Sequence, residues 1–309
     1  MMETSTKDFV IGLSLAIASC FFIGSSFIIK KLGLLRLRGS SSTPAADGGF
    51  GYLRDWVWWT GLITMGLGEA SNFAAYAFAP AALVTPLGAL SILVSAVLAP
   101  KFLNEKLNLL GKLGCMLCML GACVIVIHAP KEGDVKSLQD LNKKIFESGF
   151  LYYVLVVVVL TMYSIKFIVP RYGKTNVAVY IFICSSIGSL SVMCCKGLGL
   201  SIRKSISNSE PFLNKSFLMF ILALIICITI QMNYLNKALD SFSSNLVNPV
   251  HYIFFTSFVI LASSILFQEW RSIASIDVFA TLVGLSIVII ALFLISAFND
   301  FQITLNELY

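Results

Sequence analysis

Glu69, Asn72 and Tyr76 are polar side chains at helical spacing inside an apolar run, Trp56 to Phe78. Residues three and seven positions apart share one face of an α-helix. A carboxylate and an amide carbonyl are hard oxygen ligands of the kind that Mg²⁺ accepts, and one or two carboxylates suffice because Mg²⁺ keeps several waters. A charged group in lipid costs roughly 2.5–3.5 kcal/mol, so it usually faces the interior and marks a pathway. The open alternative is a protonated Glu69 that hydrogen-bonds a neighbouring helix.

A second group of polar side chains ends a later apolar run: Gln231, Asn233 and Asn236. No carboxylate accompanies them at mid-depth, and Gln231 is the expected counterpart of Glu69. Asn233 and Asn236 share a face at i and i+3. Each of these two could also be an ordinary hydrogen-bonding group between helices.

Asn248 and His251 flank Pro249 near the start of the next apolar run. A proline there leaves backbone groups free to line a cavity, although a packed, hydrogen-bonded His251 remains an alternative. No catalytic or cofactor-binding residues are predicted. The candidate metal pathway comprises Glu69, Asn72, Gln231, Asn233, Asn236, Asn248 and His251.

The composition is that of an integral membrane protein. Of the 309 residues, 58% are apolar and 12% are charged, and the mean hydropathy is +0.88. Soluble domains average about 45–50% apolar and about 25% charged residues. Because the apolar runs are unbroken rather than alternating, an all-α membrane fold is predicted and a barrel is not.

The apolar runs predict nine transmembrane helices, each near the length of about 20 residues that a bilayer requires. The spans are Phe9 to Ile29, Trp56 to Phe78, Ala81 to Ala99, Leu109 to Ile127, Phe150 to Val169, Val177 to Leu200, Phe217 to Leu235, Leu246 to Phe267 and Ile276 to Phe298. Small residues on one face of the second span, Gly61 and Gly68, predict close helix packing there, as does Gly121 in the fourth span.

Two stretches repeat one another in outline, Glu69 to Glu105 and Gln231 to Glu269. Each ends a span, turns, places a proline early in the next span and closes that span on a glutamate. Glu105 lies nineteen residues beyond Pro86, and Glu269 lies twenty beyond Pro249. This near-match indicates an internal duplication. The two closing glutamates are interpreted as solvated carboxylates at helix ends.

Basic residues in short loops predict the orientation, because they accumulate on the cytoplasmic side. The loop after the first span holds Lys30, Lys31, Arg36, Arg38 and Arg54. The amino terminus is then outside or lumenal and the carboxyl terminus cytosolic, so the two copies run in opposite directions. The predicted organisation is a first repeat (1–130, spans 1 to 4), a connecting loop with span 5 (131–175) and an inverted repeat (176–309, spans 6 to 9). Inverted repeats are typical of secondary transporters, which bind substrate near the bilayer midplane.

Other classes lack a visible apparatus in the sequence. The net charge of +6 is spread over loops and forms no stripe for nucleic acid. No P-loop, dinucleotide fingerprint or catalytic triad is found, so neither an enzyme nor a bound cofactor is predicted.

Four segments closely resemble the NIPA ("non-imprinted in Prader-Willi/Angelman") family of magnesium transporters: GLSLAIASCFFIGSSFIIKKLGLLR, EASNFAAYAFAPAALVTPLGALSILVSAVLA, NEKLNLLGKLGCMLCMLGACVIVIHAPKE and YLNKALDSFSSNLVNPVHYIFFTSFVILASSILFQEW. The resemblance covers most of the chain, from about Gly12 to Phe298. It implies relationship to the drug/metabolite transporter superfamily, whose usual plan has ten helices where nine are counted here. It also implies transport of Mg²⁺, with other divalent cations as further substrates, into the cytosol across the plasma membrane or early endosomes.

Two other functions stay open at this point. A metabolite or nucleotide-sugar carrier of the same superfamily would normally present basic groups to a central cavity, and such groups are scarce in the predicted spans. A membrane protein that regulates magnesium flux without transporting the ion is the third hypothesis. The expected partners are Mg²⁺ as substrate and the lipid bilayer, and a homodimer is left open.

Overall fold

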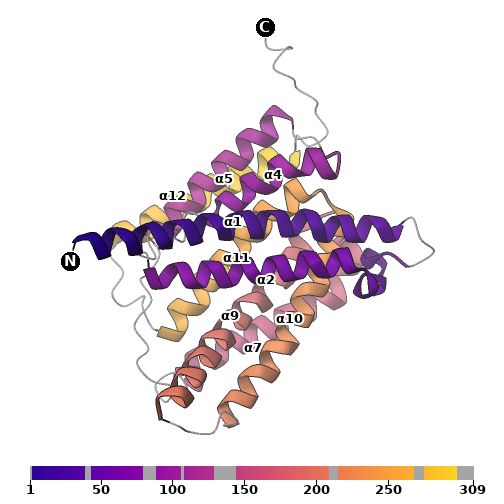
Figure 1. Ribbon diagram of the computed structural model, residues 1–309. Coiled ribbons are helices and arrows are strands. Elements are labelled where there is room, and N and C mark those ends of the chain that lie inside the picture. The colour runs from indigo at the N-terminus through magenta and orange to yellow at the C-terminus, as the bar shows by residue number, and fades with distance from the viewer. Residues whose placement is uncertain are drawn as a thin grey trace. The chain divides into compact units, whose positions relative to one another are not determined.

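A computed structural model describes residues 2–38, 43–78, 88–105, 108–128, 144–208, 215–267 and 275–297. Over these ranges the chain is helical and contains no strand (Figure 1). The α-helices are α1 (Met2–Arg38), α2 (Trp56–Phe78), α4 (Leu90–Phe102), α5 (Leu109–Ile127), α7 (Ser148–Tyr163), α8 (Val169–Tyr172), α9 (Val177–Asn208), α10 (Lys215–Ser241), α11 (Ser244–Phe267) and α12 (Ser275–Ala297). Short 3-10 turns η1 (Ala45–Asp47) and η2 (Gly51–Arg54) precede α2, and a π-helical turn η3 (Ser164–Ile168) joins α7 to α8.

The all-α prediction is confirmed, and a helix occupies part or all of each predicted span. The second and fourth spans match α2 and α5 residue for residue. The start of α5 has a local cause, because the side chain of Asn108 accepts a hydrogen bond of 2.7 Å from the backbone N–H of Gly111 and thereby caps the helix. The first part of the third span, including Pro86, lies outside the described residues.

The predicted end of the first span is wrong. Helix α1 continues past Ile29 to Arg38, and Lys30 and Lys31 lie within it with 0% and 6% of their surface exposed. The physical reason is that apolar residues resume directly after the two lysines, so the run suited to a membrane extends from Val10 to Leu37. These two lysines therefore do not belong to a loop, and the orientation that used them stays a prediction with less support.

Six of the described helices are long and apolar enough to cross a membrane, which supports a multi-pass membrane protein. They comprise the span in α1, α5, the continuous run from α7 to α8, the first part of α9, α10 and α11. Shorter apolar segments lie in α4 and α12. The tryptophans, glycines and polar residues of α2 lower its hydropathy. Nine crossings and the inverted repeat remain predictions.

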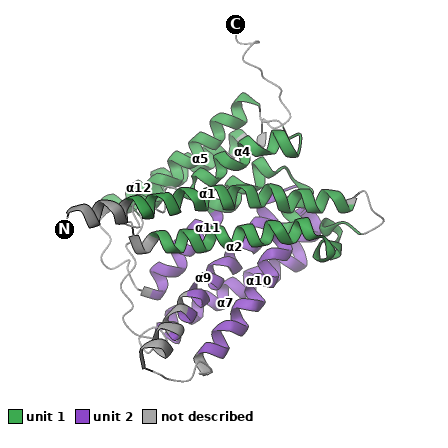
Figure 2. Ribbon diagram, in the orientation of Figure 1, with its two compact units in different colours: residues 1–129, 236–253, 275–309 green, residues 130–235, 254–274 purple. Residues whose placement is uncertain are grey.

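The chain forms two compact units (Figure 2). Unit 1 combines residues 1–129, 236–253 and 275–309, and unit 2 combines residues 130–235 and 254–274. The two units are defined by which residues contact one another, whereas the predicted repeats are defined by the similarity of two stretches of sequence. The predicted repeat boundaries therefore stay a prediction.

In unit 1, glycines bring helices into close contact. A Cβ atom on Gly61 of α2 would lie 2.8 Å from the backbone N of Lys30, and one on Gly68 would lie 3.0 Å from that of Ile23. On α5, a Cβ atom on Gly121 would lie 2.9 Å from the carbonyl oxygen of Gly284 in α12. The predicted packing faces of α2 and α5 are thus confirmed, and Figure 1 shows α1 alongside α2.

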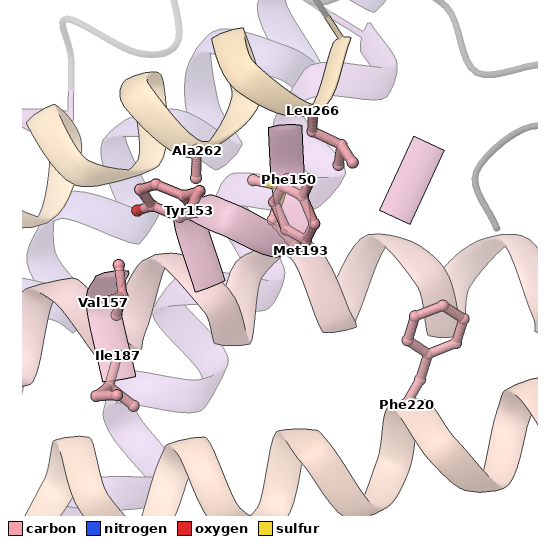
Figure 3. Packing of buried hydrophobic residues seen from close by; sticks show 8 residues of the cluster. All are labelled: Phe150, Tyr153, Val157, Ile187, Met193, Phe220, Ala262 and Leu266. Atoms are coloured by element: carbon pink, nitrogen blue, oxygen red, sulfur yellow. The ribbon is translucent and has the colours of Figure 1, made fainter. Parts of the chain in front are cut away.

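In unit 2, a cluster of apolar side chains joins α7, α9, α10 and the later part of α11. Its buried members are Phe150, Tyr153, Val157, Ile187, Met193, Phe220, Ala262 and Leu266 (Figure 3). The Tyr153 hydroxyl also lies 2.9 Å from Ser189 Oγ, a hydrogen bond between α7 and α9. Since lipid is as apolar as these side chains, close packing and such polar contacts hold the helices together.

Candidate functional site

Glu69 and Asn72 lie on α2, as the spacing predicts. Glu69 is exposed on the surface of the chain. Asn72 is half-buried, and its Oδ1 is a buried oxygen without a hydrogen-bond partner among the described residues. An unsatisfied buried acceptor is costly unless another group supplies the missing interaction. A carboxylate and such an oxygen three residues away are chemically suited to be the first protein ligands of a hard cation. The side chain of Tyr76 lies outside the described residues.

A buried cation lies near this pair. Lys30 of α1 has no exposed surface; its Nζ is 2.9 Å from Met65 Sδ and 5.0 Å from the centroid of the Phe27 ring. Gly61 on α2 leaves room for the lysine stem. Glu69 interacts electrostatically with Lys30. The sequence hypothesis overlooked this lysine because it placed Lys30 in a loop.

His251 joins the same region from α11. Its ring packs edge-on against Phe27, with ring centroids 5.5 Å apart and planes at 60°. We refer to Phe27, Lys30, Met65, Glu69 and His251 as the Lys30 cluster. Its members come from α1, α2 and α11, all within unit 1.

Asn248 and Asn236 also lie in unit 1, where each is tied to another segment. The Asn248 side-chain N–H group donates to Ser91 O at 3.2 Å and to Ser95 Oγ at 2.6 Å, both on α4. The Asn236 carbonyl oxygen accepts a hydrogen bond of 3.1 Å from the indole N–H of Trp58 on α2. These contacts support the alternative in which both amides link helices, while their predicted role toward a cation stays untested.

The Asn236 amide also has an aromatic neighbour outside the membrane helices, Tyr52 of η2. Burial raises the pKa of the Tyr52 hydroxyl, and a hydrogen bond with Asn236 lowers it by less. Tyr52 therefore stays neutral at physiological pH, and its ring packs at 4.9 Å from that of Trp58. This end of α2 is held by neutral hydrogen bonds and aromatic packing.

Gln231 and Asn233 belong to unit 2. The Gln231 carbonyl oxygen accepts a hydrogen bond of 3.2 Å from Ser191 Oγ on α9, and Asn233 is half-buried. Of the seven predicted residues, the fold thus groups Glu69 and His251 in the Lys30 cluster. Gln231 and Asn233 lie on the other unit, so a direct pairing of Gln231 with Glu69 stays a prediction.

Glu105 is not a solvated helix-end carboxylate, and that interpretation is wrong. Its carboxylate forms an ion pair with Lys31, and the exposed fractions of the two side chains are 17% and 7%. The second carboxylate oxygen accepts a hydrogen bond of 2.7 Å from the backbone N–H of Ser244, the first residue of α11. Lys31 also donates to the carbonyl oxygen of Phe242. The interpretation failed because it ended α1 before Lys31; Glu269 lies outside the described residues.

No group of three or more His, Cys, Asp or Glu side chains suited to a metal ion occurs in the ranges that the structure describes. The candidate site therefore consists of one carboxylate and neutral oxygens. Such a set matches an ion that retains part of its water shell.

Comparison with known proteins identifies the family. The family model for "Magnesium transporter NIPA" matches residues 7–301. The chain belongs to this family. The human Magnesium transporter NIPA3 is 49% identical to this NIPA chain over 298 residues, which cover 96% of the chain and 73% of the relative. The human Magnesium transporter NIPA4 is 48% identical over 302 residues, covering 97% and 74%. The Probable magnesium transporter NIPA1 of Arabidopsis thaliana is 46% identical over 299 residues, covering 97% and 89%.

No solved structure matches this NIPA chain. The resemblance found in the sequence motifs is nevertheless confirmed by the family match and by relatives that are named magnesium transporters. The family match spans α1 to α12, so it includes every candidate residue.

Proposed function

We propose that this chain carries Mg²⁺ across a membrane into the cytosol, and that a partly hydrated ion meets Glu69 and Asn72 on α2. Membership of the NIPA family supports the choice of ion. The observation that carries the site is the buried Asn72 Oδ1, which lacks a hydrogen-bond partner in the described part of the chain and lies three residues beyond an exposed carboxylate. Because oxygen ligands and retained water suit Mg²⁺, this pair is sufficient as a first contact.

The proposed mechanism is alternating access in a helical secondary transporter or facilitative carrier. An inward-negative potential contributes about 2.3 kcal/mol per charge per 100 mV, hence roughly 4.6 kcal/mol for a divalent ion, so uptake does not require a coupled ion. In the proposed arrangement nine helices cross the membrane as an inverted repeat, with the amino terminus outside or lumenal and the carboxyl terminus cytosolic. The plasma membrane or early endosomes are the proposed location.

Uptake of Mg²⁺ into proteoliposomes containing the purified chain tests this proposal. Glu69→Gln removes the charge while keeping the shape, and uptake is expected to fall at least about tenfold because the carboxylate is the one anionic ligand of the proposed site. Ser71→Ala is the matched control on the same helix, since Ser71 Oγ is exposed and donates within α2 to Leu67 O at 2.8 Å. Parental uptake by Glu69→Gln would show that the ion does not use this carboxylate.

A carrier of anionic metabolites is the second candidate, and Lys30 is the observation that bears on it. A basic residue within a membrane helix is what such a carrier needs, but Lys30 has no exposed surface with which to meet a substrate. Uptake that depends on a metabolite and ignores Mg²⁺ would favour this candidate. Purified chain that is inert in liposomes, although cellular magnesium flux depends on it, would favour a regulator.

A further inference from the structure

The proposed uptake path gives no role to Lys30, although this fully buried lysine of α1 contacts Met65 of α2. Lysine is almost never fully buried unless its charge is compensated. Here its contacts include a thioether sulfur at 2.9 Å and an aromatic face at 5.0 Å. Both are weak partners for an ammonium ion compared with a carboxylate.

The Glu69 carboxylate lies on the face of α2 that Lys30 contacts. Met65, whose sulfur contacts Lys30 Nζ, is four residues before Glu69 on α2. Four residues correspond to about 6 Å along a helix and to the same face. This spacing places the Glu69 carboxylate within electrostatic reach of Lys30. The lysine stem reaches this level because Gly61 carries no side chain where a Cβ would lie 2.7 Å from Lys30 Cγ.

We propose that Lys30 is a positioning residue that serves as the tethered counter-cation of Glu69. This inference rests on the proposed function, in which Glu69 receives Mg²⁺. When the site is empty, the ammonium balances the carboxylate in a region of low dielectric, where charges interact strongly. When Mg²⁺ binds, the ion takes over that balance and is repelled by the ammonium. Lys30 therefore weakens binding of the ion and hastens its release.

Lys30→Met is the informative substitution, because it keeps an unbranched side chain and removes the charge. It is expected to lower the KM for Mg²⁺ uptake and the Kd for Mg²⁺ binding, each by about tenfold or more, and to lower kcat because the ion is held longer. Lys30→Arg keeps the charge and should behave like the parent. Lys101→Met is the matched control: it also removes one positive charge from unit 1, but Lys101 is exposed on α4. If Lys30→Met is not recovered in folded form, Lys30→Gln carries the same expectation.

The measurements are initial uptake rates against Mg²⁺ concentration in proteoliposomes, and calorimetric titration of the purified protein with Mg²⁺ alone. Repeating Lys30→Met in the Glu69→Gln background tests the coupling, because without the carboxylate the gain in affinity should shrink to the part that comes from direct repulsion between the ammonium and the ion. Parental KM and Kd in Lys30→Met, or an equal gain in the absence of Glu69, would overturn the role of Lys30. Parental uptake by Glu69→Gln alone would instead overturn the proposed site.

Discussion

Glu105 connects three segments of unit 1, and removing its charge measures what this connection contributes. The carboxylate pairs with Lys31 of α1 and accepts the N–H of Ser244 at the start of α11. Glu105→Gln keeps an oxygen that can accept from Ser244 but takes the counter-charge from Lys31. Breaking a buried ion pair in this way costs about 3–5 kcal/mol, and because 17% of the Glu105 side chain is exposed, we expect the lower end, about 3 kcal/mol.

Thermal unfolding in detergent is the assay. For a chain of this size each kcal/mol corresponds to roughly 2 °C, so Glu105→Gln should unfold about 6 °C below the parent. Glu105→Ala also removes the cap of α11 and should lose about 1 kcal/mol more. The double variant Lys31→Met with Glu105→Gln should recover much of the loss, because it leaves no uncompensated buried charge. Additive losses in the double variant, or an unchanged unfolding temperature in Glu105→Gln, would refute the reasoning.

The remaining predictions concern close packing within each unit. In unit 1, Gly61→Ala should destabilise the protein by about 1–3 kcal/mol, because the added Cβ would lie 2.8 Å from the backbone N of Lys30; the matched control Gly66→Ala, with nothing within 4 Å of its Cβ, should be neutral or stabilise by up to about 1 kcal/mol. Equal effects of the two substitutions on thermal stability would contradict the α1–α2 contact. In unit 2, Tyr153→Phe should cost about 0.6–1 kcal/mol in the same assay through loss of the hydrogen bond to Ser189, and a stability equal to the parent would show that this bond contributes nothing.

The positions of most helices could be predicted from the sequence, because membrane helices depend on local features. The start of α2 after Asp55 and both limits of α5 follow from apolar runs bounded by polar residues, and Asn108 marks the start of α5 as a helix cap. The face shared by Glu69 and Asn72 follows from helical spacing alone. These properties require no knowledge of the rest of the fold.

The environment of the charged residues could not be predicted in the same way. Two adjacent lysines usually mark the end of a membrane span, but Lys30 is buried because Gly61 leaves space and Met65 meets its ammonium group. Glu105 contacts Lys31 and Ser244, which are distant from it in sequence. Such pairings depend on which helices become neighbours. The local signal that α1 continues is the apolar sequence that resumes at Leu32, directly after the two lysines.

The burial of Lys31 has a consequence for how the chain is made. Helix α1 is synthesised before its partners, because the carboxylate of Glu105 is 74 residues after Lys31 and the carbonyl of Phe242 is 211 residues after it. Until those segments are synthesised, Lys31 lacks these two contacts, and its long side chain can keep its charge in water by extending toward the membrane surface. The buried contacts of Lys31 therefore form only after these later segments have been made.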